Sequence, residues 1–235
     1  FRCLPMQVRS LDGIHKKLEL LKIPGLIVNP ALSLNLQELA EEKEESVEQA
    51  RAADLLFRNG ESWRGFNLMW RSMVKSLERA LEVQGKTLKG RSVLVFGGNP
   101  LARSLVYGLL RRGCVVSVTA PDDDAARKAA ELMEVRHVPF KAMYDIRCDI
   151  AAIADASIHP GPGKMELNPA YFRAEMTIAD FSQLLIDTKF LSEAKDRRSN
   201  IVDPRELGFE YLSALFKAIT GSELSRAKFD EAIPL

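Results

Sequence analysis

From residue 92 onward, short apolar runs alternate with stretches whose apolar residues recur every three or four positions. The runs are typical of buried strands and the stretches of amphipathic helices. The runs lie at 92–96, 115–119, 136–140, 149–154, 176–181 and 201–202. The helical stretches lie at 100–112, 123–133, 189–197, 204–220 and 225–233. This alternation predicts an α/β fold with a parallel sheet that is covered by helices on both faces.

The first 90 residues have a more mixed pattern. Asn59-Gly60 separates two β-rich runs and is the turn signal of a β-hairpin. The acidic residues of 41–45 are interpreted as a solvated helix face, and 85–90 is typical of a linker. The predicted strands are 1–8, 25–28, 54–57 and 62–66, and the predicted helices are 10–21, 34–51 and 68–83.

The composition is that of an ordinary globular protein. The chain has 235 residues, a hydrophobic fraction of 46% and a formal net charge of +1, which does not favour nucleic acid or acidic partners. We find neither a signal peptide nor an apolar run near the roughly 20 residues that span a bilayer. Cys3, Cys114 and Cys148 are scattered and lack metal-ligand spacing, so reduced thiols in a cytoplasmic protein are expected.

The three histidines also give no metal signature. His15, His137 and His159 are far apart in the sequence, and none has a second ligand at metal-binding spacing. They are interpreted as structural or solvated residues, and no metal is expected. An aromatic-rich group formed by Trp63, Phe66, Met69 and Trp70 predicts core packing, with an apolar pocket or partner groove as the alternative.

The most informative local feature is the turn between the strand at 92–96 and the helix that follows it. Gly97, Gly98, Asn99 and Pro100 stand where a dinucleotide-binding unit has its glycine-rich turn. The backbone of such a turn approaches a pyrophosphate. Pro100 has no N–H to offer a phosphate, although proline suits the first position of a helix. The turn is therefore a candidate cofactor-binding segment in an altered form.

Four sequence landmarks occur in the order found in one enzyme family. The first is Gly-Leu-Ile-Val-Asn-Pro-Ala-Leu-Ser at 25–33, and the second is Asn59-Gly60 followed by Gly-Phe-Asn-Leu-Met at 65–69. The third is the strand and glycine turn just described. The fourth runs from Asp180 to Thr188, continues through 190–194 and ends in the aromatic helix that closes on Thr-Gly at 220–221. With these landmarks, the chain resembles the shikimate dehydrogenase family.

The resemblance implies a two-domain α/β architecture. Residues 1–84 would form the substrate-type domain, without its first strand and helix, and 85–203 a Rossmann-like, doubly wound NAD(P)-binding domain. The helices of 204–235 would pack back on the first domain. The family reaction is the NADP-dependent interconversion of 3-dehydroshikimate and shikimate in aromatic amino-acid biosynthesis. The family is also found fused to dehydroquinate dehydratase, which is a possible fused or associated partner here.

The chain departs from the family at the positions that carry the chemistry. The family uses a lysine and an aspartate to exchange a proton with the substrate, and their positions are Ser33 and Met69 here. A serine hydroxyl titrates far outside the useful range, and a thioether carries no proton. One such group is typically worth a factor of about 10²–10⁴ in rate. Lys22 as a replacement for the lysine is an alternative alignment.

The substrate-binding positions that the resemblance assigns are also changed. Asn29 stands for a threonine, Asp54 for an asparagine and Tyr211 for a glutamine, while Leu68 replaces the threonine beside the retained Asn67. These changes remove partners for the ring hydroxyls, and a buried unpaired hydroxyl costs about 1–3 kcal/mol.

The nucleotide side is changed as well. Where the family has Asn-Arg-Thr, with the arginine on the 2′-phosphate, this chain has Ala120, Pro121 and Asp122, and then two more aspartates. Capping of the next helix is the main interpretation of the aspartates, and ribose recognition that favours NAD over NADP is the alternative. Ile153, Asp155 and Ile158 replace the turn that the family lays beside the nicotinamide.

Three functions stay open at this point. The first is a shikimate dehydrogenase-like protein whose catalysis is impaired or lost. The second is an active oxidoreductase with an altered substrate or NAD, in which Arg64, Asp54 or Asp155 would replace the missing proton-handling pair. The third is a ligand-sensing, regulatory relative. In each, the expected ligands are a shikimate-type small molecule and NADP or NAD, without nucleic acid or membrane.

Overall fold

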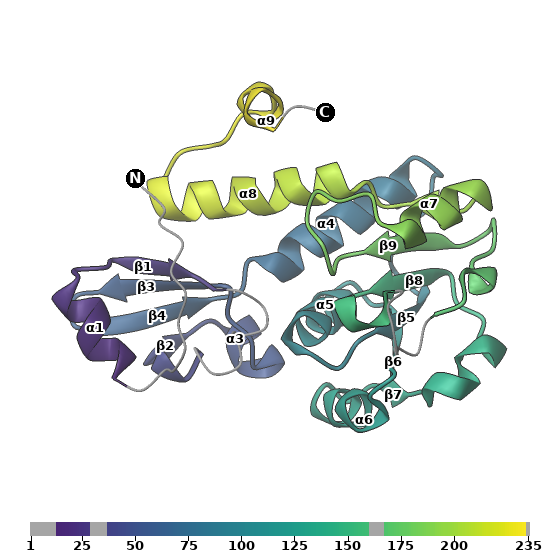
Figure 1. The fold of residues 1–235 in the computed structure, drawn as a ribbon, viewed down its shortest axis with the longest axis horizontal. Coiled ribbons are helices and arrows are strands. Elements are labelled where there is room, and N and C mark those ends of the chain that lie inside the picture. Colours follow the sequence, from purple (N-terminus) through teal and green to yellow (C-terminus); the bar gives the residue numbers. More distant parts are fainter. Residues whose placement is uncertain (1–12, 29–36, 160–166, 234–235) are drawn as a thin grey trace.

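The structure is a computed structural model that describes residues 13–28, 37–159 and 167–233. Its strands form two sheets, and two long helices lie side by side above and between them (Figure 1). The smaller sheet belongs to the first part of the chain and the larger one to the part from residue 92 onward. The predicted α/β fold with a six-stranded parallel sheet is confirmed.

The smaller sheet has four strands in the order β1-β3-β4-β2. Its centre is an antiparallel hairpin whose strands pair from Leu55↔Phe66 to Asn59↔Ser62, and Gly60 in the turn has a φ of 64°, which glycine adopts without strain. The strands are β1 (Gly25–Ile27), β2 (Glu42–Lys43), β3 (Leu55–Asn59) and β4 (Ser62–Phe66), and the helices beside them are α1 (Ile14–Leu20), η1 (Gln37–Leu39) and α3 (Glu45–Ala50).

The larger sheet is parallel throughout, in the order β10-β9-β8-β5-β6-β7. All residues of β8 and β9 are buried because helices and turns cover both faces. The strands are β5 (Ser92–Phe96), β6 (Val115–Thr119), β7 (Arg136–His137), β8 (Ile150–Ile153), β9 (Thr177–Asp180) and β10 (Asn200–Ile201). The helices are α5 (Pro100–Arg111), α6 (Asp123–Leu132) and α7 (Lys189–Asp196), with 3-10 turns η2 (Phe140–Asp145), η3 (Ala156–Ile158) and η4 (Pro169–Tyr171).

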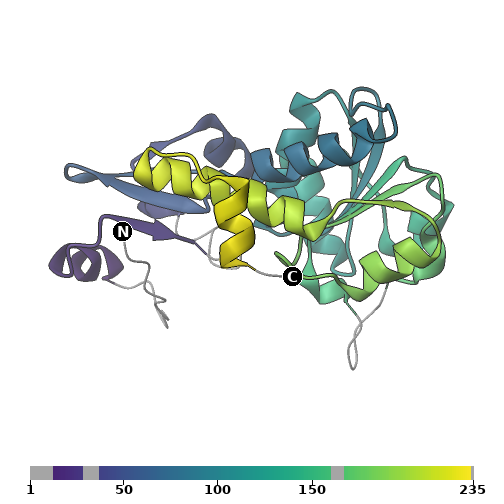
Figure 2. The ribbon, with the colours of Figure 1, turned by 90° about the horizontal axis from the view of Figure 1, so that it is seen from above.

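Two long helices connect the two sheets. The helix α4 (Met69–Glu82) leaves the smaller sheet and packs against both α5 and α8 (Pro204–Thr220). Met73, Val74 and Leu77 of α4 are fully buried because they share the face that meets these helices. The last described helix is α9 (Arg226–Ala232), which crosses the middle of α8 (Figure 2), where Phe229 packs against Phe209.

Most predicted elements are confirmed within a few residues, and the main correction concerns 34–51. The predicted charged helix is wrong: the described part of that range holds η1, the short strand β2 and only six helical residues in α3. Glu42 and Lys43 pair with Arg64 and Gly65 of β4, so an edge strand replaces the middle of the helix. The predicted strand 136–140 is shortened to two residues because η2 begins at Phe140. The predicted strand 1–8 lies outside the described residues.

The aromatic-rich group divides between two cores. Trp63 is 3% exposed and packs in the core of the smaller sheet, whereas Met69 and Trp70 belong to the core beneath α4 and α5. Phe66 packs against the second core. Core packing, the main interpretation of this group, is therefore confirmed.

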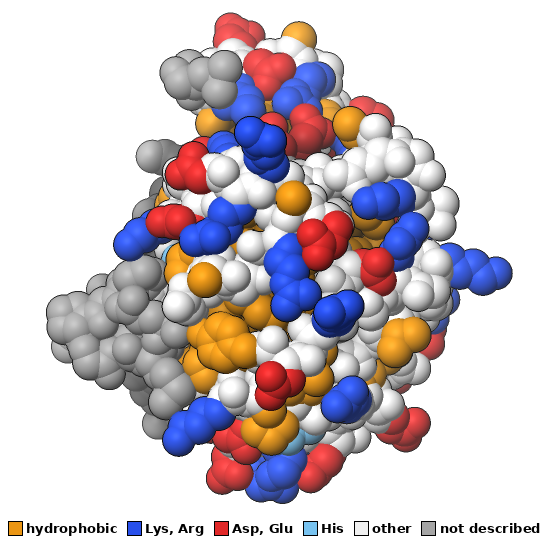
Figure 3. All heavy atoms as spheres, turned by 90° about the vertical axis from the view of Figure 1, so that its right-hand side faces the viewer, with side chains coloured by type: hydrophobic (Ala, Val, Ile, Leu, Met, Phe, Trp, Pro, Cys, Tyr) orange, Lys and Arg blue, Asp and Glu red, His pale blue; other side chains and the backbone are white. Residues whose placement is uncertain are grey.

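Charges of both signs are mixed over the outer face of the larger unit. Figure 3 shows Lys and Arg side chains beside Asp and Glu side chains on this face, with apolar areas of limited size between them. Among the described residues, none of the helices is both long and apolar enough to cross a membrane.

Candidate functional site

The glycine turn lies at the carboxyl end of β5, where open parallel sheets bind their ligands. β5 is flanked by β6 on one side and β8 on the other, so the strand order reverses at this point. Gly97 follows with a φ of 143°, a conformation that only glycine adopts readily. Asn99 then caps α5 through its side chain, which accepts a hydrogen bond from the Ala102 N–H at 2.9 Å, and Pro100 is the first helical residue. The predicted strand, turn and helix are confirmed.

Gly98 serves the packing of this turn against the next helix. A Cβ atom at Gly98 would lie 2.5 Å from the carbonyl carbon of Ala125 and 2.7 Å from the nitrogen of Ala126. The space above Gly98 is therefore filled by the backbone of α6. This close packing explains why position 98 is a glycine, and the explanation does not require a bound phosphate.

Arg103 ties the turn to the smaller sheet. Its side chain is 8% exposed and donates three hydrogen bonds to carbonyl oxygens: to Ala50 at 2.8 Å, to Gly98 at 3.1 Å and to Arg51 at 3.1 Å. Arg51 has a φ of 47°, which brings its carbonyl next to that of Ala50 at the end of α3. Burial, helped by the nearby Arg51, lowers the pKa of Arg103 to about 10.

The residues after β6 carry carboxylates and cap α6. The Asp122 side chain accepts a hydrogen bond from the Ala125 N–H at 3.0 Å, so the predicted helix capping is confirmed. Asp123 contacts His137 at 3.1 Å, and Asp124 pairs with Arg127, which also binds Glu131. Pro121 is half-buried at this corner.

The turn after β8 is closed by buried and capped residues. Ile153 and Ile158 are fully buried, and the Asp155 side chain caps η3 by accepting from the Ser157 N–H at 2.8 Å. His159 lies beyond it, with Nε2 2.9 Å from Ser182 Oγ and 3.0 Å from the buried Asp180 carboxylate. The structural interpretation of His159 is confirmed.

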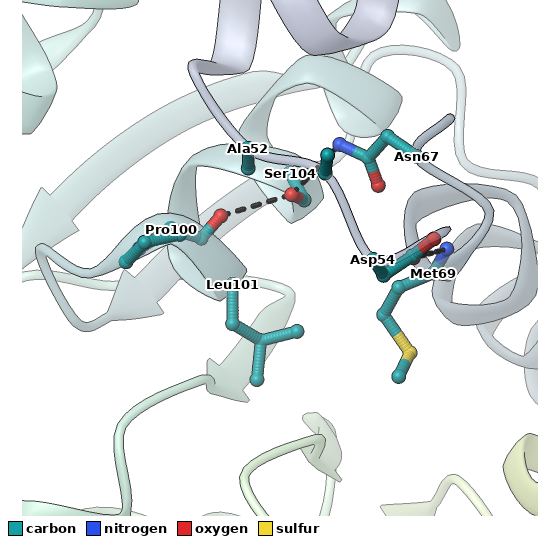
Figure 4. Close-up of a pocket in the computed structure, with 8 residues that line it drawn as sticks. Ala52, Asp54, Asn67, Met69, Pro100, Leu101 and Ser104 are labelled. Carbon is teal, nitrogen blue, oxygen red and sulfur yellow. Dashed lines mark hydrogen bonds between the residues drawn. The ribbon is translucent and has the colours of Figure 1, made fainter. Parts of the chain in front are cut away.

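A small pocket lies where α4, α5 and the smaller sheet meet (Figure 4). It brings together Asp54, Asn67 and Met69 from the predicted substrate and catalytic positions with Pro100 from the glycine turn. Its cavity is about 20 Å³, room for about one water molecule. The other lining residues are Ala52, Ala53, Leu101 and Ser104.

Asp54 is the charged group of this pocket. Its backbone accepts from the Val28 N–H and donates to the Phe66 carbonyl, so the ends of two strands hold it in place. Its carboxyl is 6% exposed and accepts hydrogen bonds from the first two N–H groups of the α4 turn, Leu68 at 2.9 Å and Met69 at 2.5 Å. These bonds lower the pKa of Asp54, but burial outweighs them and raises it to about 6.

Met69 and Asn67 complete the walls. Figure 4 shows the Met69 thioether and the Leu101 side chain pointing into the same space, while the Asp54 carboxyl faces the start of α4. Asn67 donates to Ser104 Oγ at 2.9 Å and so joins the smaller sheet to α5. Tyr211 of α8 is 6% exposed, and both burial and the Asp54 charge raise the pKa of its phenol.

Not every predicted site residue can be placed. Asn29 and Ser33 lie outside the described residues. Lys22 is described, in a left-handed turn with a φ of 51° after α1. Among the described residues, no group of three or more His, Cys, Asp or Glu side chains could hold a metal ion.

Among the described residues that line this pocket, Asp54 is the one ionisable group, and its raised pKa of about 6 places its proton exchange near neutral pH. The Asp54 carboxyl is buried beside the glycine turn's helix, and the neighbouring Met69 carries no exchangeable proton. The sequence pointed to these residues only through the resemblance. Arg103 was missed, because its pattern is that of an ordinary helical residue and only the fold brings its three carbonyl acceptors together.

The putative NAD(P)-binding family matches residues 86–209. The chain belongs to this family. The matched range begins just before β5 and ends within α8, so it includes the glycine turn and the whole larger sheet.

Curated relatives support the resemblance stated from the sequence. The chain is 23% identical over 169 residues to the shikimate dehydrogenase (NADP(+)) of Syntrophobacter fumaroxidans. This alignment covers 70% of this chain and 57% of the relative. It is 23% identical over 189 residues to the shikimate dehydrogenase (NADP(+)) of Aquifex aeolicus. This alignment covers 78% of this chain and 66% of the relative. The chain thus spans less than two thirds of either relative. The resemblance to shikimate dehydrogenases is confirmed.

Solved structures show the same fold. The shikimate dehydrogenase of Aquifex aeolicus superposes with a TM-score of 0.85 at 18% identity, over 98% of this chain and 84% of that one. A quinate dehydrogenase from Corynebacterium glutamicum in complex with NAD gives a TM-score of 0.79 at 18% identity, over 94% of this chain and 81% of that one. At such identities the likeness shows the fold alone.

Proposed function

We propose that this chain is a shikimate dehydrogenase-like protein that binds a nicotinamide dinucleotide but interconverts 3-dehydroshikimate and shikimate far more slowly than its active relatives. A bound nicotinamide would accept or supply the hydride of that reaction. The chain's own residues would have to hold the ring and move the proton. The observation that carries the proposal is the Met69 thioether in the pocket at the start of α4.

The proton chemistry supports this. Hydride transfer from a ring C–H leaves the hydroxyl proton to be removed, and a thioether has no site that would take it at neutral pH. By the resemblance, the partner position is Ser33, whose hydroxyl is no better a base.

The shape of the pocket supports it as well. A cavity of about 20 Å³ between Ala52, Ala53 and Leu101 has little room for a carboxylated, hydroxylated ring. The Asn67 side chain already donates its hydrogen bond to Ser104. The Tyr211 side chain is buried close enough to Asp54 for the carboxylate charge to act on its phenol. The hydroxyls of shikimate would therefore lose water without gaining an equal number of partners.

The dinucleotide part rests on the family match and on the glycine turn. Gly97 in its left-handed conformation and the start of α5 fit the approach of a dinucleotide. The carboxylates after β6 favour NAD over NADP, since they would face a 2′-phosphate with like charge.

Two measurements test the proposal. Isothermal titration calorimetry with NADH and NADPH measures binding, and absorbance of the reduced nucleotide with shikimate or 3-dehydroshikimate measures turnover, with the Aquifex aeolicus enzyme as positive control. We expect binding of at least one nucleotide and turnover at least 10³-fold below the control. Turnover in the ordinary enzyme range of about 1–10³ s⁻¹ would refute the proposal.

A second function is favoured by one observation, the buried Asp54 carboxyl. An oxidoreductase that acts on an alcohol other than shikimate needs one positioned base, and Asp54 is such a group in the same pocket. A ligand-sensing role and association with a dehydroquinate dehydratase stay predictions. Thermal shift with shikimate and co-purification of the two proteins test them.

A further inference from the structure

Asp155 lies at the carboxyl end of β8 and directly against the glycine turn. β8 is the neighbour of β5 in the larger sheet, and the two strands run in parallel (Figure 1). A Cβ atom at Gly97 would lie 3.1 Å from the Cβ of Asp155 and 3.4 Å from the carbonyl carbon of Ala154. The Asp155 side chain therefore starts beside the turn, at the edge of the sheet where open α/β folds bind their ligands.

The Asp155 carboxyl has acceptor capacity to spare. Its Oδ1 accepts a hydrogen bond from the Ser157 N–H at 2.8 Å and so caps η3. Within the described part of the chain, no group donates to Oδ2 and no cationic side chain pairs with the carboxyl. The residue is only partly buried. One carboxylate oxygen beside the glycine turn is thus available to a ligand.

The aspartate at the end of the next strand is different. Asp180 ends β9, and its side chain has no exposed surface. The Ser182 hydroxyl donates to its Oδ1 at 2.6 Å, the Thr188 hydroxyl donates to its Oδ2 at 2.7 Å, and His159 Nε2 lies 3.0 Å from Oδ2. Asp180 is therefore fully engaged within the protein, and Asp155 is the carboxylate of these two strand ends that can face a ligand.

The order of the strands decides which half of a dinucleotide meets Asp155. In a doubly wound sheet the pyrophosphate lies over the first glycine turn, and the adenosine ribose lies toward the end of the following strand. Here these are the turn after β5 and the end of β6. Because β8 lies on the other side of β5, the nicotinamide half would extend toward the end of β8. Asp155 is thus on the nicotinamide side of the turn, and Asp122, which follows β6, is on the adenosine side.

We propose that Asp155 determines which oxidation state of the dinucleotide this chain prefers: its carboxylate favours the oxidised nicotinamide over the reduced one. The oxidised ring carries a positive charge, whereas the reduced ring is neutral, so a nearby carboxylate attracts only the oxidised form. The inference rests on the dinucleotide binding proposed above. It adds a residue and a redox preference that neither the family match nor the resemblance assigns.

The same carboxylate also faces the negative charge of the pyrophosphate. This repulsion weakens the oxidised and the reduced dinucleotide equally, because both carry the same two phosphates. The ratio of their two dissociation constants cancels the repulsion, together with any change in the shape of the turn that affects both forms. A change in this ratio between variants therefore reports the interaction with the charge on the ring.

The test measures the dissociation constants of NAD⁺, NADH and ADP-ribose by calorimetry for the full chain and its variants. Asp155→Asn and Asp155→Ser remove the charge but keep an acceptor for the Ser157 N–H, since asparagine and serine are both good caps. Asp155→Glu keeps the charge. Asp122→Asn is the matched control, because Asp122 caps α6 in the same way, through the Ala125 N–H at 3.0 Å. Thermal unfolding shows which variants are folded.

We expect the ratio of the NADH constant to the NAD⁺ constant to fall about fivefold or more in Asp155→Asn and Asp155→Ser, as for the removal of one charge from a partly solvated site. A fivefold change corresponds to about 20 mV in the potential of the bound two-electron couple. In the same two variants, the constant for ADP-ribose, which lacks the ring, should follow that for NADH. Asp155→Glu should keep the ratio of the wild type, and Asp122→Asn should change both constants by the same factor.

The outcomes separate this proposal from the proposed function. If the wild type binds none of the three ligands, the proposed function fails and the redox preference fails with it. If the wild type binds them and the folded uncharged variants keep its ratio within about twofold, only the redox preference is wrong. An equal loss of affinity for all three ligands would also overturn the preference, because the carboxyl would then bind a ribose hydroxyl and not the ring charge.

Discussion

The guanidinium of Arg103 donates through Nη1 to the carbonyl oxygen of Gly98 at 3.1 Å. The other two hydrogen bonds of the same side chain go to Ala50 and Arg51, at the end of α3. One buried cation thus links the glycine turn of the larger sheet to the smaller sheet. Together with the Asn67–Ser104 hydrogen bond and the packing of α4 on α5, this side chain joins the two parts beside the pocket.

Replacing Arg103 with methionine should destabilise the fold strongly. The substitution keeps most of the apolar stem but leaves three carbonyl oxygens without this donor, one of them buried and two partly buried, and an unpaired buried acceptor costs about 1–3 kcal/mol. We expect the free energy of unfolding in urea to fall by about 3 kcal/mol or more.

Arg111→Met is the matched control for Arg103. Arg111 lies on the same helix, is half exposed and pairs with Glu45 at 3.3 Å. Its loss should cost less than about 1 kcal/mol, as for other surface ion pairs. Equal losses for the two variants would contradict the linking role of Arg103.

Gly98→Ala tests whether this glycine is needed for packing. The new Cβ would lie 2.5 Å from the Ala125 backbone, so α6 or the turn must move. We expect a loss of about 1–3 kcal/mol in unfolding free energy. Gly60→Ala is the comparison: it meets no atom within 4 Å and has only the strain of a φ of 64°, about 1 kcal/mol. A Gly98→Ala protein as stable as the wild type would show that the contact yields easily.

The larger sheet was predictable because its signals are local. Each strand there is a short apolar run, and Asn99, Asp122 and Gly221 mark helix ends by capping chemistry that needs only a few neighbouring residues. The structure of the range 34–51 was not predictable in this way. Its strand β2 has only two residues and is fixed by its pairing with β4, about 20 residues later in the chain. Local charge spacing favoured a helix that the tertiary pairing overrides.

The sequence predicted which residues belong to the site, but it did not predict their burial or their hydrogen bonds. The resemblance placed Asp54, Asn67 and Met69 in one region, and the pocket contains all three. The burial of Asp54 and its bonds to the α4 N-terminus could not be derived from the sequence, since they depend on how α4 meets the smaller sheet. The Arg103 contacts depend on the same junction.

Stability should depend on pH through Asp54. Burial raises its pKa from 3.8 to about 6, so the folded protein binds this proton more tightly than the unfolded chain. The resulting stability is fully present below about pH 4 and is lost as the pH rises through about 6, up to about 3 kcal/mol. Urea unfolding between pH 4 and 7.5 should show the decline in the wild type relative to Asp54→Asn. A constant difference between the two proteins across this range would contradict the raised pKa.

Restoring the family's proton-handling pair should raise turnover of shikimate only if the rest of the pocket admits the ring. The variant combines Ser33→Lys with Met69→Asp. Because the Met69 N–H already binds Asp54, the new carboxylate at position 69 lies near a second one, and like charges raise the pKa of one of them. We therefore expect at least a 10-fold gain when Asp54→Asn is added and a smaller gain without it, measured as NADH or NADPH formation from shikimate. An absence of any gain in the triple variant would place the barrier in the size of the cavity.

Nucleotide preference should be set at the corner after β6. The Asp122 carboxylate caps α6 there, Asp123 and Asp124 follow, and Arg127 on the same helix is bound to Asp124 and Glu131. A 2′-phosphate would meet negative charge, so we expect NADH to bind more tightly than NADPH. Pro121→Arg places a cation at the position where the resemblance puts the family's arginine, and one charged hydrogen bond to phosphate is worth about 1.5–3 kcal/mol.

NADPH affinity should accordingly rise about 10-fold or more in Pro121→Arg, while NADH affinity stays within about threefold. Pro121→Gln is the control, because it removes the same ring and adds a polar side chain of similar reach without the charge. Calorimetric titrations of both variants with both nucleotides decide the point. Equal gains for arginine and glutamine would mean that release of the proline ring, and not the charge, controls the site, whereas stronger NADPH binding by the wild type would show that the carboxylates after β6 do not face the ribose.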